Sequence, residues 1–111
     1  MSHGNAVLML LLAALLETGG DALVRRGLHA AAALPKVAFL AAGGIVLFAY
    51  GYTVNAPSWD FGRLLGLYVV FFFLTAQVVS WVAFHQKPSP ALLVGGAFIV
   101  LGGAIIAVCN R

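Results

Sequence analysis

The sequence contains few charged residues. Only 8% of its 111 residues are Asp, Glu, Lys or Arg, six of them basic and three acidic, whereas a soluble domain has about a quarter. Hydrophobic residues make up 63%, so too few polar side chains remain to cover a soluble enzyme or to keep a disordered tail in water. The basic residues are scattered and form no patch, which excludes nucleic acid as a partner.

Cysteine is also scarce. The single cysteine, Cys109, excludes an intrachain disulfide and a cysteine metal cluster. His3, His29 and His85 lie outside the apolar runs and lack the mutual spacing of metal ligands. The sequence has no nucleophile–base set and no glycine-rich phosphate loop. We therefore expect a protein that is not an enzyme and that holds no metal and no cofactor.

Long apolar runs make up most of the chain, whose length fits about four membrane spans of roughly 20 residues. The bilayer core offers no water, so the backbone of each run must satisfy its own hydrogen bonds as a helix. The sequence predicts one all-α integral membrane domain over residues 1–111, surrounded by lipid, with helices over about 6–24, 37–54, 64–84 and 90–108.

Lys and Arg are distributed unequally between the two sides of these spans. Four lie near the first and third connections and two on the other side: Arg25, Arg26, Lys36 and Lys87 against Arg63 and Arg111. Because basic residues favour the cytoplasmic side, we expect a multi-pass membrane protein with both termini outside. So small a difference also fits insertion in both orientations.

Glu17 is the most informative residue of the sequence. The first run reaches spanning length only when Glu17 is included, which puts a carboxylate inside the membrane. Such carboxylates are costly in hydrocarbon, usually face a bundle interior or a wet cavity, and commonly bind protons or cations. A proton and a cationic substrate would then compete for Glu17. The alternative is a protonated Glu17 that only hydrogen-bonds to a neighbouring helix.

Asp21 lies one helical turn after Glu17, and Arg25 lies one turn after Asp21. Residues four apart share a helix face, so the three form one polar stripe that leads to a helix end. Asp21 is either a second group of the proton and substrate site or the partner of Arg25 in an ion pair near the membrane surface. In either case Arg25 can extend toward the headgroups.

The third run contributes Tyr68 and Thr75, which share a helix face because they are seven residues apart. A tyrosine there could donate a hydrogen bond to Glu17 and present its ring to an organic cation. We expect both residues to belong to the substrate site. The neighbouring Phe71–Phe73 and Trp81 are expected to pack against lipid or other helices.

The fourth run contains two glycine pairs spaced by seven residues, Gly95 with Gly96 and Gly102 with Gly103. Small residues on one face allow helices to approach closely in lipid. Apart from Asn110 and Arg111 at its end, this helix has no polar side chain, so we expect it to form a dimer interface. Packing within the monomer is the alternative.

These features resemble the small multidrug resistance family of the drug/metabolite transporter superfamily, over roughly residues 8–108. The resemblance rests on the following residues: Leu16-Glu17-Thr18-Gly19-Gly20, Arg25, Ser80-Trp81, Phe84-His85-Gln86-Lys87, Pro90, Gly95 and Gly102. It implies a proton-coupled antiporter of four short helices that works as an antiparallel dimer. It also implies one Glu17 from each subunit in a shared site that exchanges protons for cations.

One segment is similar to a different family. Leu65 and Tyr68 stand where the drug exporters usually have Tyr and Trp, and Asp21 has no counterpart in them. The stretch from Gly62-Arg63 to Tyr68 instead resembles a sister family of small four-helix inner-membrane proteins.

We therefore expect a proton-coupled exporter of small cationic or polar compounds. Four helices are too few to enclose an alternating-access path, so two copies, or one copy and a paralogue, would supply the repeats between which transporter sites lie. Two other hypotheses stay open. One is a non-transporting helical subunit or assembly factor, and the other is a carrier for a lipid-linked or sugar-containing headgroup or a related metabolite.

Overall fold

The computed structural model describes residues 3–109, which form four helices: α1 (His3–Leu28), α2 (Ala33–Val54), α3 (Phe61–Phe84) and α4 (Pro90–Cys109). All four are long and apolar enough to cross a membrane, and no strand occurs within these residues. The structure thus confirms the all-α fold with four potential spans. Asn110 and Arg111, which enter the sequence argument, lie outside the described residues.

The helices extend beyond the apolar runs of the sequence. α1 continues to Leu28, α2 begins at Ala33 and α3 begins at Phe61, because polar and small residues can prolong a helix past its apolar part. Pro35 lies in the first turn of α2, where its missing N–H would have had no helical partner.

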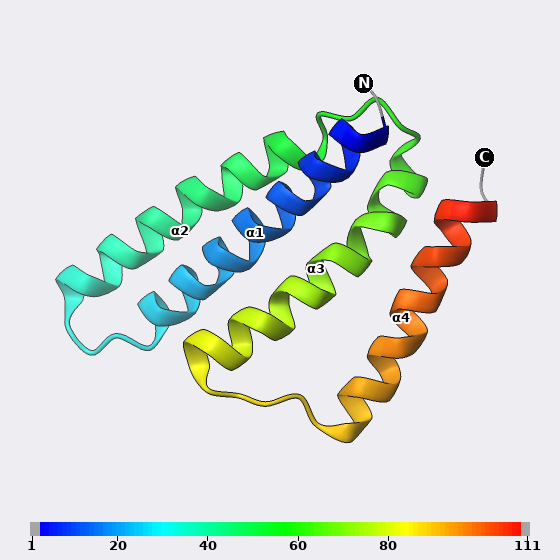
Figure 1. The fold of residues 1–111 in the computed structure, drawn as a ribbon. Helices are drawn as coiled ribbons and strands as arrows, with labels where there is room; N and C mark the ends of the chain where they lie inside the picture. Colours follow the sequence, from blue (N-terminus) through cyan, green and yellow to red (C-terminus); the bar gives the residue numbers. More distant parts are fainter. Residues whose placement is uncertain (1–2, 110–111) are drawn as a thin grey trace.

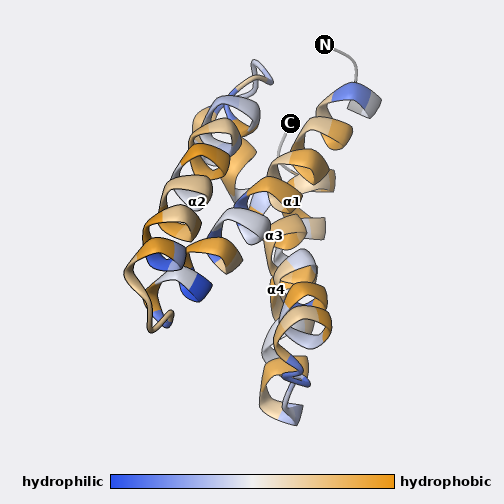
Figure 2. Ribbon diagram, turned by 90° about the vertical axis from the view of Figure 1, so that its left-hand side faces the viewer, coloured by the Kyte–Doolittle hydropathy of each residue, from blue (hydrophilic) through white to orange (hydrophobic). Residues whose placement is uncertain are grey.

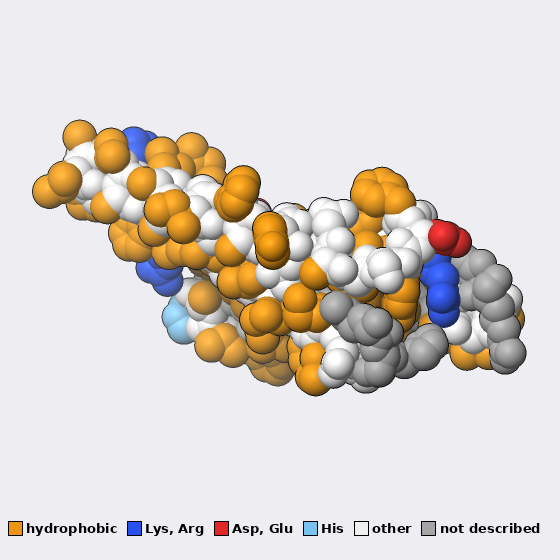
Figure 3. All heavy atoms as spheres, turned by 90° about the horizontal axis from the view of Figure 1, so that it is seen from above, with side chains coloured by type: hydrophobic (Ala, Val, Ile, Leu, Met, Phe, Trp, Pro, Cys, Tyr) orange, Lys and Arg blue, Asp and Glu red, His pale blue; other side chains and the backbone are white. Residues whose placement is uncertain are grey.

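α1 and α3 are the two inner helices of the chain. α1 packs against both α2 and α3, and α3 also packs against α4 at the edge (Figure 1). The molecule measures 50 × 34 × 19 Å, so one copy is a thin layer of helices and not a closed bundle. In Figure 2 most of the helical ribbon has the colour of hydrophobic residues. Figure 3 shows apolar side chains over much of the face it presents, with charged side chains toward the two ends of that face.

Glycines bring α1 and α2 to backbone contact. A Cβ atom on Gly43 would lie 2.7 Å from Val24 Cγ2 and 3.0 Å from the Gly20 carbonyl oxygen. On the other helix, a Cβ on Gly20 would meet Leu47 at 2.8 Å. Lipid gives no hydrophobic drive for helix association, so such close approach is the main source of packing energy between these helices.

The buried core lies around the first half of α1. It is formed by side chains of three helices: Leu10, Ala13, Ala14, Val54, Leu64 and Tyr68. Beyond this core, α1 and α3 run in the same direction (Figure 1), and a groove opens between their C-terminal halves. Glu17 lies on α1 after the last core residue of that helix and before the groove.

Candidate functional site

The Glu17 carboxylate is held by a residue 51 positions further along the chain. The Tyr68 hydroxyl of α3 donates a hydrogen bond to Glu17 Oε1 at 2.7 Å. Tyr68 is only 4% exposed and belongs to the core, whereas Glu17 is half-buried. This hydrogen bond ties the carboxyl group of α1 to α3 within the span. The structure therefore brings together Glu17 and Tyr68, as the sequence predicted.

Aromatic rings from α2 and α3 adjoin this pair. The ring centroids of Tyr50 and Tyr68 are 5.7 Å apart, and those of Tyr68 and Phe72 are 6.3 Å apart. Aromatic faces attract cations, so the surroundings of Glu17 suit a positively charged group.

Two threonines, one on α1 and one on α3, use their hydroxyls within their own helices. Thr18 is 4% exposed and donates to the Ala14 carbonyl at 2.8 Å. Thr75, which the sequence places in the substrate site, donates to the Phe71 carbonyl at 2.7 Å. Within the described residues Thr75 makes no hydrogen bond to Glu17, so the structure does not join it to the carboxylate.

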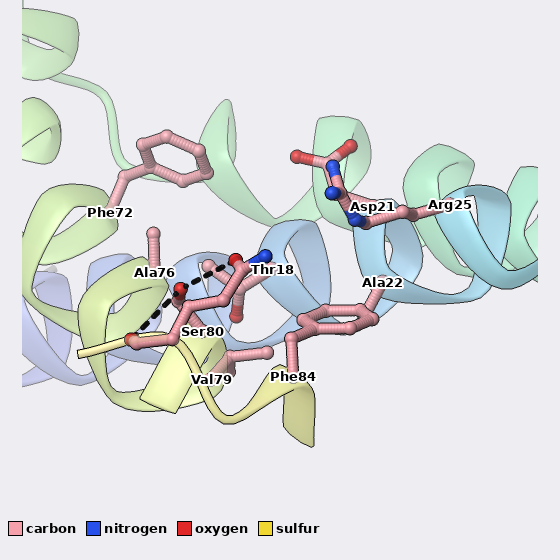
Figure 4. A pocket seen from close by; sticks show the side chains of 10 residues that line it. Thr18, Asp21, Ala22, Arg25, Phe72, Ala76, Val79, Ser80 and Phe84 are labelled. Carbon is pink, nitrogen blue, oxygen red and sulfur yellow. Dashed lines mark hydrogen bonds between the residues drawn. The ribbon is translucent and has the colours of Figure 1, made fainter. Parts of the chain in front are cut away.

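A groove of about 260 Å³ lies between α1 and α3 and begins at Thr18, the residue that follows Glu17 in the chain (Figure 4). Its α1 wall includes Thr18, Asp21 and Arg25, and its α3 wall runs from Phe72 through Ser80 to Phe84 and Gln86. Ser80 donates to the Gln86 side-chain oxygen at 3.3 Å. The groove therefore carries one acidic group, one basic group and neutral polar groups between apolar walls.

Asp21 and Arg25 do not neutralise each other. Within residues 3–109 no ion pair joins them, although both line the groove. The Arg25 guanidinium instead lies over the Phe84 ring, 5.4 Å from its centroid. Asp21 is exposed. Of the two roles predicted for Asp21, the structure gives no support to the ion pair within one copy.

The four glycines predicted for a dimer interface fall into two pairs. Gly96 and Gly103 are buried against α3, where an added Cβ would contact Phe73 and Val70. Gly95 and Gly102 have no such neighbour within 4 Å. The first pair therefore packs within the monomer, and a dimer interface stays a prediction for Gly95 and Gly102.

Tyr50 is the residue that the sequence analysis did not place in the site. It lies seven residues after Gly43, the glycine at which α2 contacts α1, and this spacing puts both on the same helix face. The spacing therefore places Tyr50 toward α1 only once Gly43 is known to contact α1.

Among the described residues, no three His, Cys, Asp or Glu side chains lie together as a metal site requires.

Comparisons with known proteins identify the family. Residues 5–111 match the family described as "Uncharacterised BCR, YnfA/UPF0060 family". A "UPF0060 membrane protein" from Herpetosiphon aurantiacus is 33% identical over 109 residues, covering 96% of each chain. No solved structure matches. Membership of the small multidrug resistance family itself stays a prediction, whereas the match over nearly the whole length shows that the chain belongs to the YnfA/UPF0060 family of membrane proteins.

Proposed function

We propose that this protein is a proton-coupled antiporter that exports small cationic or polar compounds across a bacterial inner membrane. It would work as a dimer, with Glu17 carrying either a proton or the substrate. The observation that supports this most directly is the hydrogen bond of Tyr68 to Glu17. It holds a carboxylate inside a membrane span, next to aromatic rings. The next residue, Thr18, lines a groove that leads to the end of the helix.

The exchange follows from the cost of charge in the membrane. An ionised Glu17 without a partner is expensive in a medium of low polarity. Binding of a proton or of a cation neutralises the carboxylate and removes this cost. Once Glu17 is neutralised by one of them, it no longer attracts the other, so the two compete for the same group. Binding of the cation on one side and of the proton on the other would then couple the two movements.

A second copy completes the path. One chain is a layer only 19 Å thick in its shortest dimension, and its groove is open along one side. Two copies could enclose Glu17 and present it alternately to the two sides, as sites between repeats do in other transporters. The partner could be an identical chain or a paralogue.

Proton release on cation binding tests the proposal. Purified protein in weakly buffered detergent would be mixed with tetraphenylphosphonium or guanidinium, and the released protons measured with a pH dye. We expect saturable release from the parent protein and none from Glu17→Gln. The matched control is Asp60→Asn, which changes an exposed carboxylate at the start of α3 and should keep full release.

The result also separates the proposal from its alternatives. If Glu17 only joins α1 to α3 in a non-transporting subunit, Glu17→Gln will lower the thermal stability, and neither cation will release protons from the parent protein. Equal release from the parent and from Glu17→Gln would likewise contradict the proposal, because the protons would come from another group.

A further inference from the structure

The groove between α1 and α3 has charges in a defined order. Arg25 lies in the last turn of α1 and, with Gln86 and Phe84, lines the part of the groove nearest the end of that helix, which we call its mouth. Asp21 lies one turn deeper, about 6 Å along the helix axis, and Thr18 and Phe72 line the inner end. Positive charge therefore lies at the mouth and negative charge further inside.

Neither charge is neutralised within the described part of the chain. The Arg25 guanidinium is placed over the ring of Phe84, itself a wall of the groove, which leaves its N–H groups free to bind an anion. Asp21 is exposed and has no basic partner in residues 3–109. Unpaired charges within a membrane span are costly and commonly bind a ligand or ion.

We propose that the groove admits small zwitterions, in which a primary ammonium group binds Asp21 while an attached anionic group binds Arg25. This inference rests on the proposed function, because the ammonium group is what would pass on to Glu17. It narrows the substrate class from cations in general to amines that carry a carboxylate, sulfonate or phosphate.

The order of the charges favours a free zwitterion over a phospholipid headgroup. In a phosphatidylethanolamine the phosphate lies between the ammonium group and the acyl chains, so the phosphate is the deeper group. The groove has the opposite order, with the site for the ammonium group deeper than the site for the anion. A free molecule can enter with its ammonium group first, whereas a lipid would have to invert.

The step at Glu17 is a displacement without covalent chemistry. The zwitterion first binds at the mouth, where Asp21 and Arg25 satisfy both of its charges. Its ammonium group then moves one helical turn inward to Glu17, which accepts the hydrogen bond of Tyr68, whose ring adjoins that of Tyr50. Protonated Glu17 releases its proton to water as the ammonium group takes its place.

A pair of probes with the same carbon skeleton tests this. β-Alanine and propylamine both carry a primary ammonium group, and only β-alanine carries a carboxylate. The concentration for half-maximal proton release would be measured for each probe, and their ratio gives the preference for the zwitterion. We expect Arg25→Gln to reduce this preference by roughly three- to fivefold, the value of one exposed charge pair.

The neighbouring arginine provides a matched control. The Arg26 guanidinium also lies over Phe84, at 5.6 Å, and donates to the Ala83 carbonyl at 3.4 Å, but Arg26 does not line the groove. Arg26→Gln should therefore leave the preference unchanged. Arg25→Lys, which keeps the charge, should retain it and shows that a loss in Arg25→Gln comes from the charge and not from misfolding.

The outcomes distinguish this inference from the proposed function. An unchanged preference in Arg25→Gln, or an equal loss in Arg26→Gln, overturns the zwitterion site. So does proton release by tetraphenylphosphonium or guanidinium without any release by β-alanine, a result that leaves cation–proton exchange standing. Release by none of the four compounds overturns both proposals.

Discussion

At the scale of single residues, Tyr68 combines two roles. Its ring belongs to the core and packs beside Tyr50 and Phe72, and its hydroxyl donates to Glu17. Tyr68→Phe removes only the second role. Because a half-buried carboxyl oxygen loses its hydrogen-bond donor, we expect the free energy of unfolding to fall by about 1 to 3 kcal/mol. Denaturant titration in mixed micelles would measure this.

The same variant also informs the exchange. Since Glu17 keeps its carboxylate in Tyr68→Phe, proton release on cation binding should persist, with a several-fold weaker affinity for the cation. A complete loss of release, with the helical content retained, would show that the Tyr68 hydroxyl itself takes part in the exchange.

Asp21 should matter for substrate binding more than for stability. It is exposed and forms no ion pair in the described chain, so Asp21→Asn should change the free energy of unfolding by less than about 1 kcal/mol. The affinity for cations, measured by proton release, should fall several-fold because the entry carboxylate is gone. If Asp21→Asn and the control Asp60→Asn release protons at the same cation concentrations, the substrate does not pass Asp21.

At the scale of helices, Gly43 sets the distance between α1 and α2. In Gly43→Ala the new methyl group would press on Val24 and on the Gly20 backbone, so we expect a loss of about 1 to 3 kcal/mol in the free energy of unfolding. The matched control is Gly44→Ala, whose Cβ meets nothing within 4 Å. That control should be neutral or stabilising, because alanine has the higher helix propensity. Equal effects of the two variants would contradict the close contact.

The outer glycines of α4 test the dimer. Gly102 has no neighbour within 4 Å of an added Cβ, whereas Gly103 packs on Val70. Gly102→Leu should therefore reduce dimer formation while leaving the monomer folded, because association in lipid is only marginally favourable. Crosslinking in bilayers would measure it. Gly103→Leu should instead disturb the packing of α4 on α3. A fully dimeric Gly102→Leu would place the interface elsewhere.

At the scale of the whole molecule, the basic residues predict the orientation. The connections at 29–32 and 85–89 lie at the end that carries Arg25, Arg26, Lys36 and Lys87, and α4 returns to the opposite end. By the preference of basic residues for the cytoplasm, the C-terminal end of α4 should lie outside.

The single cysteine is a native reporter of this orientation. Cys109 is exposed at the end of α4, so a membrane-impermeant maleimide should label it in intact spheroplasts. Ser89→Cys in a Cys109→Ser background provides the control on the other side and should be labelled only after permeabilisation. If about half of the Cys109 protein and about half of the Ser89→Cys protein are labelled in intact spheroplasts, the chain inserts in both orientations. Labelling of Ser89→Cys but not of Cys109 in intact spheroplasts would contradict the prediction.

Much of the fold follows from the sequence alone. Apolar runs of spanning length leave the backbone no alternative to helices in a medium without water, and the helices lie where these runs predict, with somewhat longer ends. Glu17 is equally evident, because a carboxylate in such a run has to be satisfied by a partner. Tyr68 was predicted as this partner, since it is the tyrosine of the third run.

The rotation of each helix about its axis was decided only by the tertiary structure. Helical spacing shows which residues share a face, but helices that are apolar all round give no signal for the face turned inward. The sequence therefore could not tell that Gly96 and Gly103, and not Gly95 and Gly102, contact α3, or that Thr75 bonds within its own helix. For the same reason the sequence did not show that Tyr50 belongs to the site. Only the glycine contact between α1 and α2 shows that the face of α2 with Tyr50 is turned toward α1. In lipid that choice depends on the fit of small side chains against neighbouring helices, which is a property of two helices together and not of either sequence segment.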